Sequence, residues 1–174
     1  NTNGNDVKIR ENRATQFRHF AVLGGSGNLI IGNHWFQGDS ETQGLRLAGI
    51  VLAQTNVRTT IVGNYIDNSS IGWTNEYEFA PDFQNQFSFG GLTVTGNHFM
   101  AIDVAPSFKW LLIKPYGTGH FVQGLNVSGN VFRCINGSVD RVEGTDTSFA
   151  PLDNSRMRNV VFAGNSFNGL TQPT

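Results

Sequence analysis

Three aspartates stand at positions where a β-rich chain could carry out acid–base chemistry. Asp39 and Asp103 each lie six residues after an asparagine that follows glycine, and Asp67 lies three residues after another such asparagine. If these segments stack as coils about 4.8 Å apart, Asp39 and Asp103 are two coils, or roughly 10 Å, from each other. Inverting glycosidases hold two carboxyl groups about 6.5–9.5 Å apart, so the three aspartates are candidate catalytic residues, with Asp67 and His98 assisting proton transfer. The alternative is that they are turn residues, since Asp and Asn commonly occur where strands end.

Aromatic and charged side chains in two segments, 71–87 and 103–120, are candidates for contact with a sugar. Sugar rings stack on aromatic rings through their C–H faces, carboxylates bind their hydroxyl groups, and lysines bind acidic sugars. The candidate substrate-binding residues are Trp73, Glu76, Tyr77, Glu78, Lys109, Trp110, Lys114 and Tyr116. The alternative is structural: the first segment is held to an outer wall by its aromatic residues, and Trp110 begins a buried strand with solvated lysines at its ends.

The elements that would position these residues are indicated by a repeat. A Gly-Asn pair recurs at nearly even intervals, and the asparagines are 21, 31, 33, 33 and 35 residues apart. A fixed period of this size is typical of stacked, similar units. The copies are Glu11-Asn12 (degenerate), Gly32-Asn33, Gly63-Asn64, Gly96-Asn97, Gly129-Asn130 and Gly164-Asn165. Unrelated hairpin turns in a sandwich or barrel are the alternative, disfavoured because the order is Gly-Asn and the intervals exceed hairpin spacing.

Positions around each asparagine repeat in residue type. The residues three before it and two after it are apolar in every copy, and most of those five before it are apolar too. Such alternation predicts two short strands that turn these side chains inward, with a bend between them. We expect the asparagine itself to adopt the left-handed backbone conformation at the bend, and the stacked amides to form a hydrogen-bonded ladder.

This pattern, from Val7 to Leu170, resembles the right-handed parallel β-helix superfamily, the pectate-lyase-like fold, in which an asparagine ladder marks the turn between the second and third strands of each coil. The resemblance implies an all-β, right-handed single-stranded parallel β-helix of about six coils, in a single domain over residues 1–174. It also implies a ligand groove along the first strands, walled by loops after the third. First strands are expected near 18–23, 45–53, 86–90, 109–114 and 147–152. Because no amphipathic helix covers the start of the stack, we expect further N-terminal coils in a longer protein, of which this chain is a C-terminal fragment. The alternative is that another chain covers that end.

The motifs of catalytic family members are absent from this chain. It has no Asp-Asp pair and no Arg-x-Lys, and Gly119-His120-Phe121 stands where polygalacturonase-like members have Gly-His-Gly. We therefore expect a carbohydrate-associated module that binds or processes a polysaccharide, as hydrolase or lyase. The alternative is a structural or adhesive β-helix, such as a trimeric tailspike-like or surface protein without catalysis in this fragment. Fold alone does not decide between them.

Composition limits the kinds of partner that the chain can bind. The formal net charge of -1 provides no basic field for nucleic acid, and no apolar run is long enough for membrane insertion. We expect no cofactor and no metal site: His34 and His98 share an outward column with Tyr65 between them, and ring packing is the favoured interpretation. Outward apolar residues on the second strands indicate a face covered by loops or by a neighbouring subunit, as in a homotrimer. The resemblance places the protein outside the cell, or on a cell or virion surface.

Overall fold

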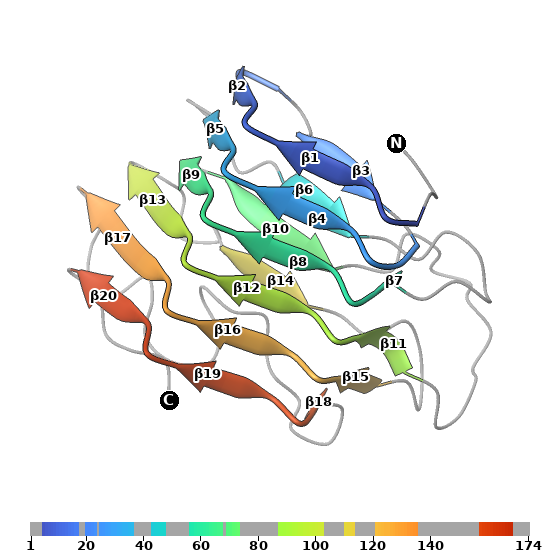
Figure 1. Ribbon diagram of the computed structural model, residues 1–174. Helices are drawn as coiled ribbons and strands as arrows, with labels where there is room; N and C mark the ends of the chain where they lie inside the picture. Colours follow the sequence, from blue (N-terminus) through green and yellow to red (C-terminus); the bar gives the residue numbers. More distant parts are fainter. Residues whose placement is uncertain are drawn as a thin grey trace.

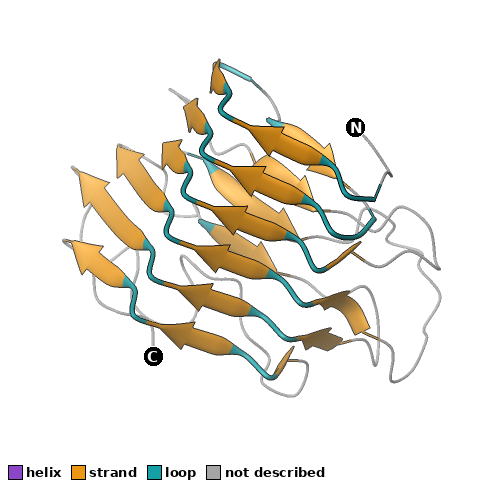
Figure 2. Ribbon diagram, viewed as in Figure 1, coloured by secondary structure: helices purple, strands orange, loops and turns teal. Residues whose placement is uncertain are grey.

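The computed structural model describes the chain in ten stretches. They are residues 5–17, 20–23, 25–36, 43–47, 56–67, 69–73, 87–102, 110–113, 121–135 and 157–168. These stretches hold strands and turns, with no helix among them, and hence no helix that could cross a membrane (Figure 2).

Two parallel six-stranded sheets form the body of the molecule (Figure 1). The first, the β1 sheet, consists of β1 (Lys8–Arg10), β4 (Leu29–Ile31), β8 (Thr60–Val62), β12 (Thr93–Thr95), β16 (Asn126–Ser128) and β19 (Val161–Ala163). The second, the β2 sheet, consists of β2 (Arg13–Thr15), β5 (His34–Phe36), β9 (Tyr65–Asp67), β13 (His98–Ile102), β17 (Val131–Ile135) and β20 (Ser166–Asn168). Each strand pairs only with its equivalents in the coils before and after it, so the chain winds as a parallel β-helix of about six coils.

Two four-stranded sheets complete the coils. One contains β3 (Ala21–Leu23), β6 (Gln43–Leu47), β10 (Ser70–Trp73) and β14 (Leu111–Ile113). The other contains β7 (Asn56–Val57), β11 (Phe87–Gly90), β15 (Phe121–Gln123) and β18 (Met157–Arg158). In Figure 1 the front strands run right to left and the strands behind them left to right while the coils descend, which is a right-handed winding.

The structure corrects one expectation about these smaller sheets. The expected first strand at 86–90 is a strand, β11, but it pairs with β7 and β15 and leads directly into β12. The first strand of that coil is instead β10, which includes residues 71–73 of the candidate sugar-contact segment 71–87. The expected strands at 18–23, 45–53 and 109–114 overlap β3, β6 and β14, and 147–152 lies outside the described residues.

The core is filled by the positions that the repeat predicted to point inward. In the four central coils the residues three before and two after the ladder asparagine are at most 1% exposed. They are Ile30, Ile61, Val94 and Val127 before it, and Trp35, Ile66, Phe99 and Phe132 after it. Rings stack from coil to coil, with centroids 4.7 Å apart for Phe99 and Phe132 and 5.1 Å for Phe132 and Phe167. In-register pairing therefore places like side chains over like, as in an aromatic stack.

The predicted asparagine ladder is confirmed. From Asn12 to Asn165, the backbone N–H and the side-chain Nδ2 of each asparagine both donate to the Oδ1 of the asparagine in the following coil, at 2.9–3.0 Å. The Nδ2 group also donates to backbone carbonyls, as Asn97 does to Ile61 at 2.9 Å and Thr95 at 3.1 Å. Asn33, Asn64, Asn97 and Asn130 are at most 1% exposed, and these bonds satisfy amide groups that would otherwise be costly to bury.

The expected backbone conformation of the asparagine was wrong. The left-handed conformation belongs to the residue before it, with φ of 63–64° at Gly32, Gly63, Gly96, Gly129 and Gly164. In the first coil Glu11 adopts it at φ 56°. A Cβ on Gly32, Gly63 or Gly96 would meet nothing within 4 Å, so glycine is favoured there by its backbone freedom and not by lack of space.

A second column of left-handed residues, which we call the corner column, lies six positions before each ladder asparagine, at the turn that leads into the β1 sheet. It consists of Asp6, Gly27, Arg58, Gly91, Gly124 and Asn159, all with φ between 54 and 73°. Neighbours in this column fit closely: a Cβ on Gly91 would lie 3.1 Å from Arg58 Cγ. Each complete coil therefore turns two corners, five residues apart, on a left-handed residue.

Candidate functional site

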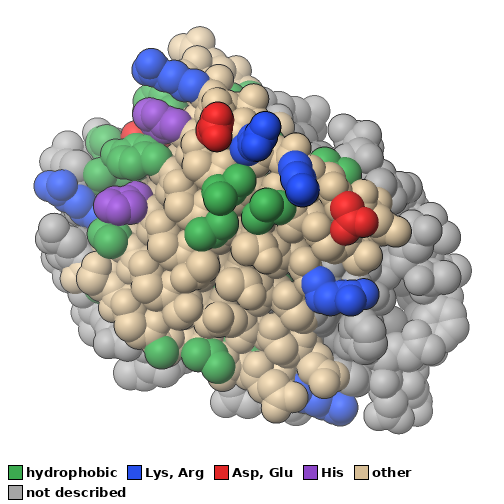
Figure 3. All heavy atoms as spheres, viewed as in Figure 1, with side chains coloured by type: hydrophobic (Ala, Val, Ile, Leu, Met, Phe, Trp, Pro, Cys, Tyr) green, Lys and Arg blue, Asp and Glu red, His purple; other side chains and the backbone are tan. Residues whose placement is uncertain are grey.

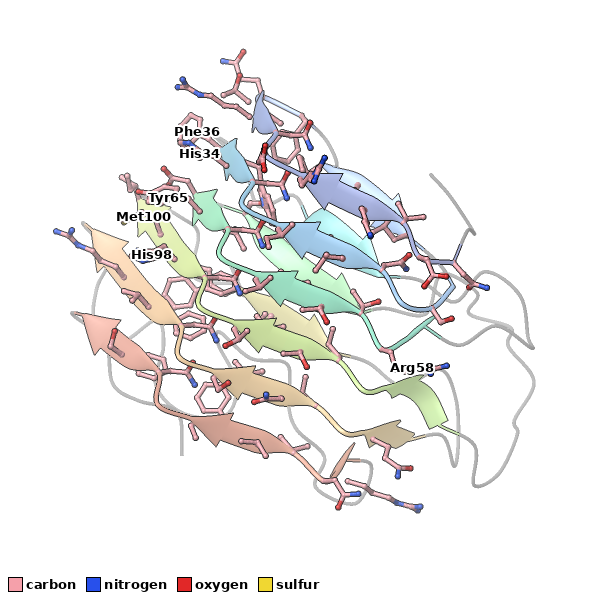
Figure 4. The ribbon with its side chains drawn as sticks, in the orientation of Figure 1. His34, Phe36, Arg58, Tyr65, His98 and Met100 are labelled. Atoms are coloured by element: carbon pink, nitrogen blue, oxygen red, sulfur yellow. The ribbon has the colours of Figure 1, made fainter. Side chains whose placement is uncertain are left out.

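The outer face of the β2 sheet carries two columns of side chains. Because the second residue of each strand is turned into the core, the first and third residues point outward. In-register pairing aligns His34, Tyr65 and His98 in one column, and Phe36, Asp67 and Met100 in the other. We call these six residues the ring face. Figure 4 shows the labelled members projecting from β5, β9 and β13 on one side of the molecule, and Figure 3 shows histidine and hydrophobic side chains gathered there.

The first column is a stack of rings. The His34 and Tyr65 ring centroids are 4.8 Å apart at an interplanar angle of 70°, an edge-to-face contact. Tyr65 and His98 lie 6.3 Å apart at 18°. The predicted ring packing is therefore confirmed, and because His34 and Tyr65 are half-buried and His98 is exposed, ring surface is left open to a ligand.

The second column holds a carboxyl group between two apolar side chains. Asp67 pairs in register with Phe36 on one side and Met100 on the other, and it is half-buried. Its Oδ1 atom is buried and accepts no hydrogen bond. A buried acceptor without a donor destabilises a fold by about 1–3 kcal/mol. Other described residues, among them Trp35, Ser69 and Asn126, also bury a polar atom without a hydrogen-bond partner. Asp67 differs from these three in being ionisable and in lying beside a stack of rings.

Electrostatics couple the two columns. Burial raises the pKa of the Asp67 carboxyl, and the nearby His34 opposes that rise. Burial is also the main cause of the raised pKa of Tyr65; Asp67 adds to the rise and Arg133 opposes it. Tyr65, Asp67 and His34 are thus close enough to sense one another's charge, which is typical of functional clusters.

Basic side chains lie at both ends of the ring face. Arg13 precedes His34 in the first column, and Arg133 follows Met100 in the second. Both arginines are exposed, and each is two strands away from β9. Asp67 is the one carboxylate among the residues that the described strands β2, β5, β9, β13 and β17 place in these two columns.

A metal centre is not formed by the part of the chain that the structure describes, because no three His, Cys, Asp or Glu residues gather there in a way that could hold an ion. His34 and His98 are separated by the Tyr65 ring in the stack. The ring face can thus offer a ligand aromatic surface, a carboxyl group and imidazole nitrogens.

Most of the sequence-predicted site lies outside the described residues. This holds for Asp39, Asp103, Glu76, Tyr77, Glu78, Lys109, Lys114 and Tyr116. Asp67 is described and belongs to the ring face. The remaining two residues, Trp73 and Trp110, lie on the β3–β14 side of the coil, away from the ring face.

Trp73 ends strand β10, where it pairs in register with Leu47 and Ile113. Trp110 is 1% exposed and packs against Phe132, with ring centroids 5.3 Å apart. Its ring therefore has no free face for a sugar in this conformation, in agreement with the alternative interpretation of a buried strand at 110–113.

Sequence reasoning missed Phe36 and Met100. Both stand three residues after a ladder asparagine, the same place that Asp67 occupies in its own coil. This shared offset from the ladder asparagine was the one signal in the sequence. Because outward positions vary freely in residue type, the column cannot be recognised as a motif.

The outer face of the β1 sheet is different in character. The outward residues of its central strands are small, uncharged and mostly β-branched: Thr60, Val62, Thr93, Thr95, Asn126 and Ser128. Ile31 is 37% exposed and Val161 51%, and Leu29, Val62 and Ala163 also reach this surface. The outward orientation expected for these residues is confirmed.

The ring face remains the surface with the most varied chemistry among the described residues: ring planes, an acceptor without a donor, and flanking cations. Comparison of the chain with protein-family models, with curated proteins and with solved structures found no match.

Proposed function

We propose that this chain is a carbohydrate-associated β-helix module that binds a polysaccharide, with the ring face as the contact surface. The observation that carries the proposal is the stack of His34, Tyr65 and His98 beside the Asp67 carboxyl group. A sugar has an apolar C–H face and a rim of hydroxyl groups. Aromatic rings suit the first and a carboxyl oxygen suits the second, so one sugar residue can use both columns at once.

The direction of the columns favours a polymer over a single sugar. Both columns run along the axis of the β-helix, and they repeat at the interstrand distance of about 4.8 Å. A linear chain lying along this axis could meet a ring on each of three successive coils. Weak contacts repeated along one chain add up to useful avidity.

Processing of the bound polysaccharide is the second part of the proposal. In the pectate-lyase-like fold that the sequence resembles, the groove lies along the first strands, and Asp39, Asp103 and the segments 71–87 and 103–120 would line it here. These residues would supply a hydrolase or lyase with its acid and base, and the ring face would hold another part of the polymer on a different side of the coil. An extracellular place, or one on a cell or virion surface, suits such a module.

Binding is tested first. Affinity electrophoresis or calorimetry against a panel of soluble polysaccharides should detect at least one ligand for the wild-type protein. Tyr65→Leu, which removes the ring but keeps an apolar side chain, should weaken that binding about tenfold, equivalent to about 1.4 kcal/mol. Tyr65→Phe keeps the ring and should retain most of the affinity, and Lys8→Ala on the other sheet is the control. Equal affinity of Tyr65→Leu and wild type would remove the ring face from the proposal.

Catalysis is tested separately. Release of reducing ends, or of unsaturated products absorbing in the ultraviolet, should be followed with each polysaccharide that binds. Cleavage that is lost in Asp103→Asn, with binding retained, supports a hydrolase or lyase. Binding without turnover in the wild-type protein supports a module that only attaches to the polymer.

A structural role is the second candidate, and the exposed apolar side chains of the β1 sheet favour it. Ile31 and Val161 lie at nearly opposite ends of this sheet, in strands β4 and β19. A homotrimer that covers the sheet would bury both. Light scattering should then give three times the chain mass, and the Ile31→Lys/Val161→Lys double variant should return it to the monomer mass. A monomer at all concentrations for the wild type would remove this candidate.

A further inference from the structure

We infer that the ring face recognises uncharged sugar residues and that Asp67 is the residue that excludes acidic ones. The inference rests on the proposed function and deepens it by naming the substrate class. It follows from three observations: the state of the Asp67 oxygen, the apolar side chains beside it, and the position of the neighbouring cations.

The first observation concerns hydrogen bonding. The Asp67 side chain lies on an outer face and the residue is half-buried, but its Oδ1 atom is fully buried and accepts no hydrogen bond. The residue is only half-buried, so a ligand meets the part of the carboxyl group that reaches the surface. A ligand hydroxyl group can donate a hydrogen bond to an ionised carboxyl group, whereas a ligand carboxylate or sulfate offers only acceptors. Because Oδ1 has no donor inside the protein, the negative charge of Asp67 is poorly compensated, and a ligand donor is favoured over a ligand acceptor.

The second observation concerns charge. Phe36 and Met100 flank Asp67 in register, so the carboxylate sits in surroundings poorer in water than an exposed aspartate. Charges interact more strongly as the local dielectric constant falls. A sugar carboxylate brought over Tyr65 would therefore meet repulsion from Asp67 that solvent screens only in part, and a like charge placed at a contact is an effective way to reject a partner.

The third observation concerns Arg13 and Arg133, the groups that could favour an acidic polymer. Each is exposed and each is two strands from β9, or about 10 Å along the stack. Arg133 still reaches Tyr65 electrostatically, since it opposes the rise in the Tyr65 pKa, but solvent screens an exposed arginine more than the half-buried Asp67. A polymer with a carboxylate on every residue would also place one near Asp67 when it lies over the three stacked rings, because Asp67 and the central ring, Tyr65, belong to the same strand. The arginines are better placed to donate hydrogen bonds to hydroxyl groups beyond the stack.

The test compares pairs of polymers with the same linkage that differ in charge: polygalacturonate against its carboxyl-reduced neutral form, and polyglucuronate against its carboxyl-reduced neutral form, at matched length. Dissociation constants are measured by calorimetry at pH 7 in 150 mM salt. We expect at least one neutral polymer to bind the wild-type protein about tenfold more tightly than its acidic counterpart. Asp67→Asn keeps the shape of the side chain and should improve binding of the acidic polymer, which reduces that ratio to near one.

Two controls make the outcome specific. Glu11→Gln removes a carboxylate from an exposed corner of the first coil, away from the ring face, and should leave the ratio unchanged. Asp67→Ser tests the same point without an amide donor. Tighter binding of the acidic polymer by the wild type, or an unchanged ratio in both Asp67 variants, would overturn the inference and leave a carbohydrate function standing. Absence of binding to every polymer would instead remove the proposed function itself.

Discussion

Asn33 donates two hydrogen bonds to one atom of Asn64: the backbone N–H lies 2.9 Å and the side-chain Nδ2 3.0 Å from Asn64 Oδ1. The same pair of bonds links every successive pair of ladder asparagines from Asn12 to Asn165. One side chain per coil thus satisfies a backbone donor and an amide donor of the coil before it. The bend that positions the β2 sheet, and with it the ring face, therefore depends on a residue that the core packing alone does not require.

Asn97 is the ladder position where substitution should do most harm. It is 0% exposed, and Asn97→Ala would remove the acceptor of the buried Asn64 N–H and one bond each from Asn64 Nδ2, the Ile61 carbonyl and Asn130 Oδ1. Asn64 Nδ2 keeps its bonds to the Ile30 and Val62 carbonyls, and Asn130 Oδ1 keeps the Asn97 backbone N–H. One buried unpaired donor costs about 1–3 kcal/mol and each further lost bond about 1 kcal/mol, so we expect a loss of at least about 3 kcal/mol in urea unfolding. Asn12→Ala, at the exposed end of the ladder, should lose about 1 kcal/mol. Similar losses in both variants would contradict the ladder as a buried network.

Glu11 adopts the left-handed conformation that glycine adopts in the five later coils. A non-glycine residue there is strained by about 1–2 kcal/mol. Replacing it by glycine removes this strain, but it also raises the entropy of the unfolded chain, which offsets part of the stabilisation. We expect Glu11→Gly to stabilise the protein by about 0.5–1 kcal/mol. Gly96→Ala should destabilise it by about 1–2 kcal/mol although the site has room for a methyl group. Calorimetric melting of the two variants checks both signs, and a neutral Gly96→Ala would count against the backbone explanation.

Phe132 lies at the centre of the aromatic stack, between Phe99 and Phe167 and against Trp110. Phe132→Ala should lower the free energy of unfolding by about 3–5 kcal/mol, since it leaves a cavity among rigid neighbours. The matched variant Phe167→Ala, at a half-buried position in the last coil, should lose clearly less. Equal losses would indicate that the coils unfold independently of the stack.

Asp67 should make stability depend on pH in the direction opposite to that of an ion-paired aspartate. Its pKa is raised in the folded protein, mainly by burial, so the folded state binds a proton more tightly than the unfolded state. The resulting stabilisation is complete below the ordinary aspartate pKa of about 3.9 and is lost as the pH rises through the raised value. Asp67→Asn should therefore raise the melting temperature at pH 7 and lose this advantage near pH 3.5. The reverse order would show that the carboxylate is stabilised by a partner.

The coil architecture could be predicted because it depends on residues that face inward and repeat. Ile30, Ile61 and Val94 occupy equivalent places because packing permits few alternatives there, and Asn33 and Asn64 do so because only an amide both accepts from one coil and donates to another. These constraints act at every turn of the helix, so they remain visible in a single sequence.

Other features could not be predicted from the sequence because no single residue type is required for them. The corner column contains Asp6, Arg58 and Asn159 among its glycines, since a left-handed backbone can be held by several residues at modest cost. The ring face could not be predicted for a different reason. Solvent imposes no pattern of residue types on Phe36 and Met100, and only the register of β5, β9 and β13 places them beside Asp67.

The amide ladder also has a polarity. Every rung gives its N–H groups to the coil that follows and turns its carbonyl oxygen toward the coil that precedes. Two copies of such a stack could be joined through this column only head to tail, because two like ends would place acceptor oxygens against acceptor oxygens or N–H donors against N–H donors. A filament grown by end-to-end addition would consequently be one-way, with distinguishable tips.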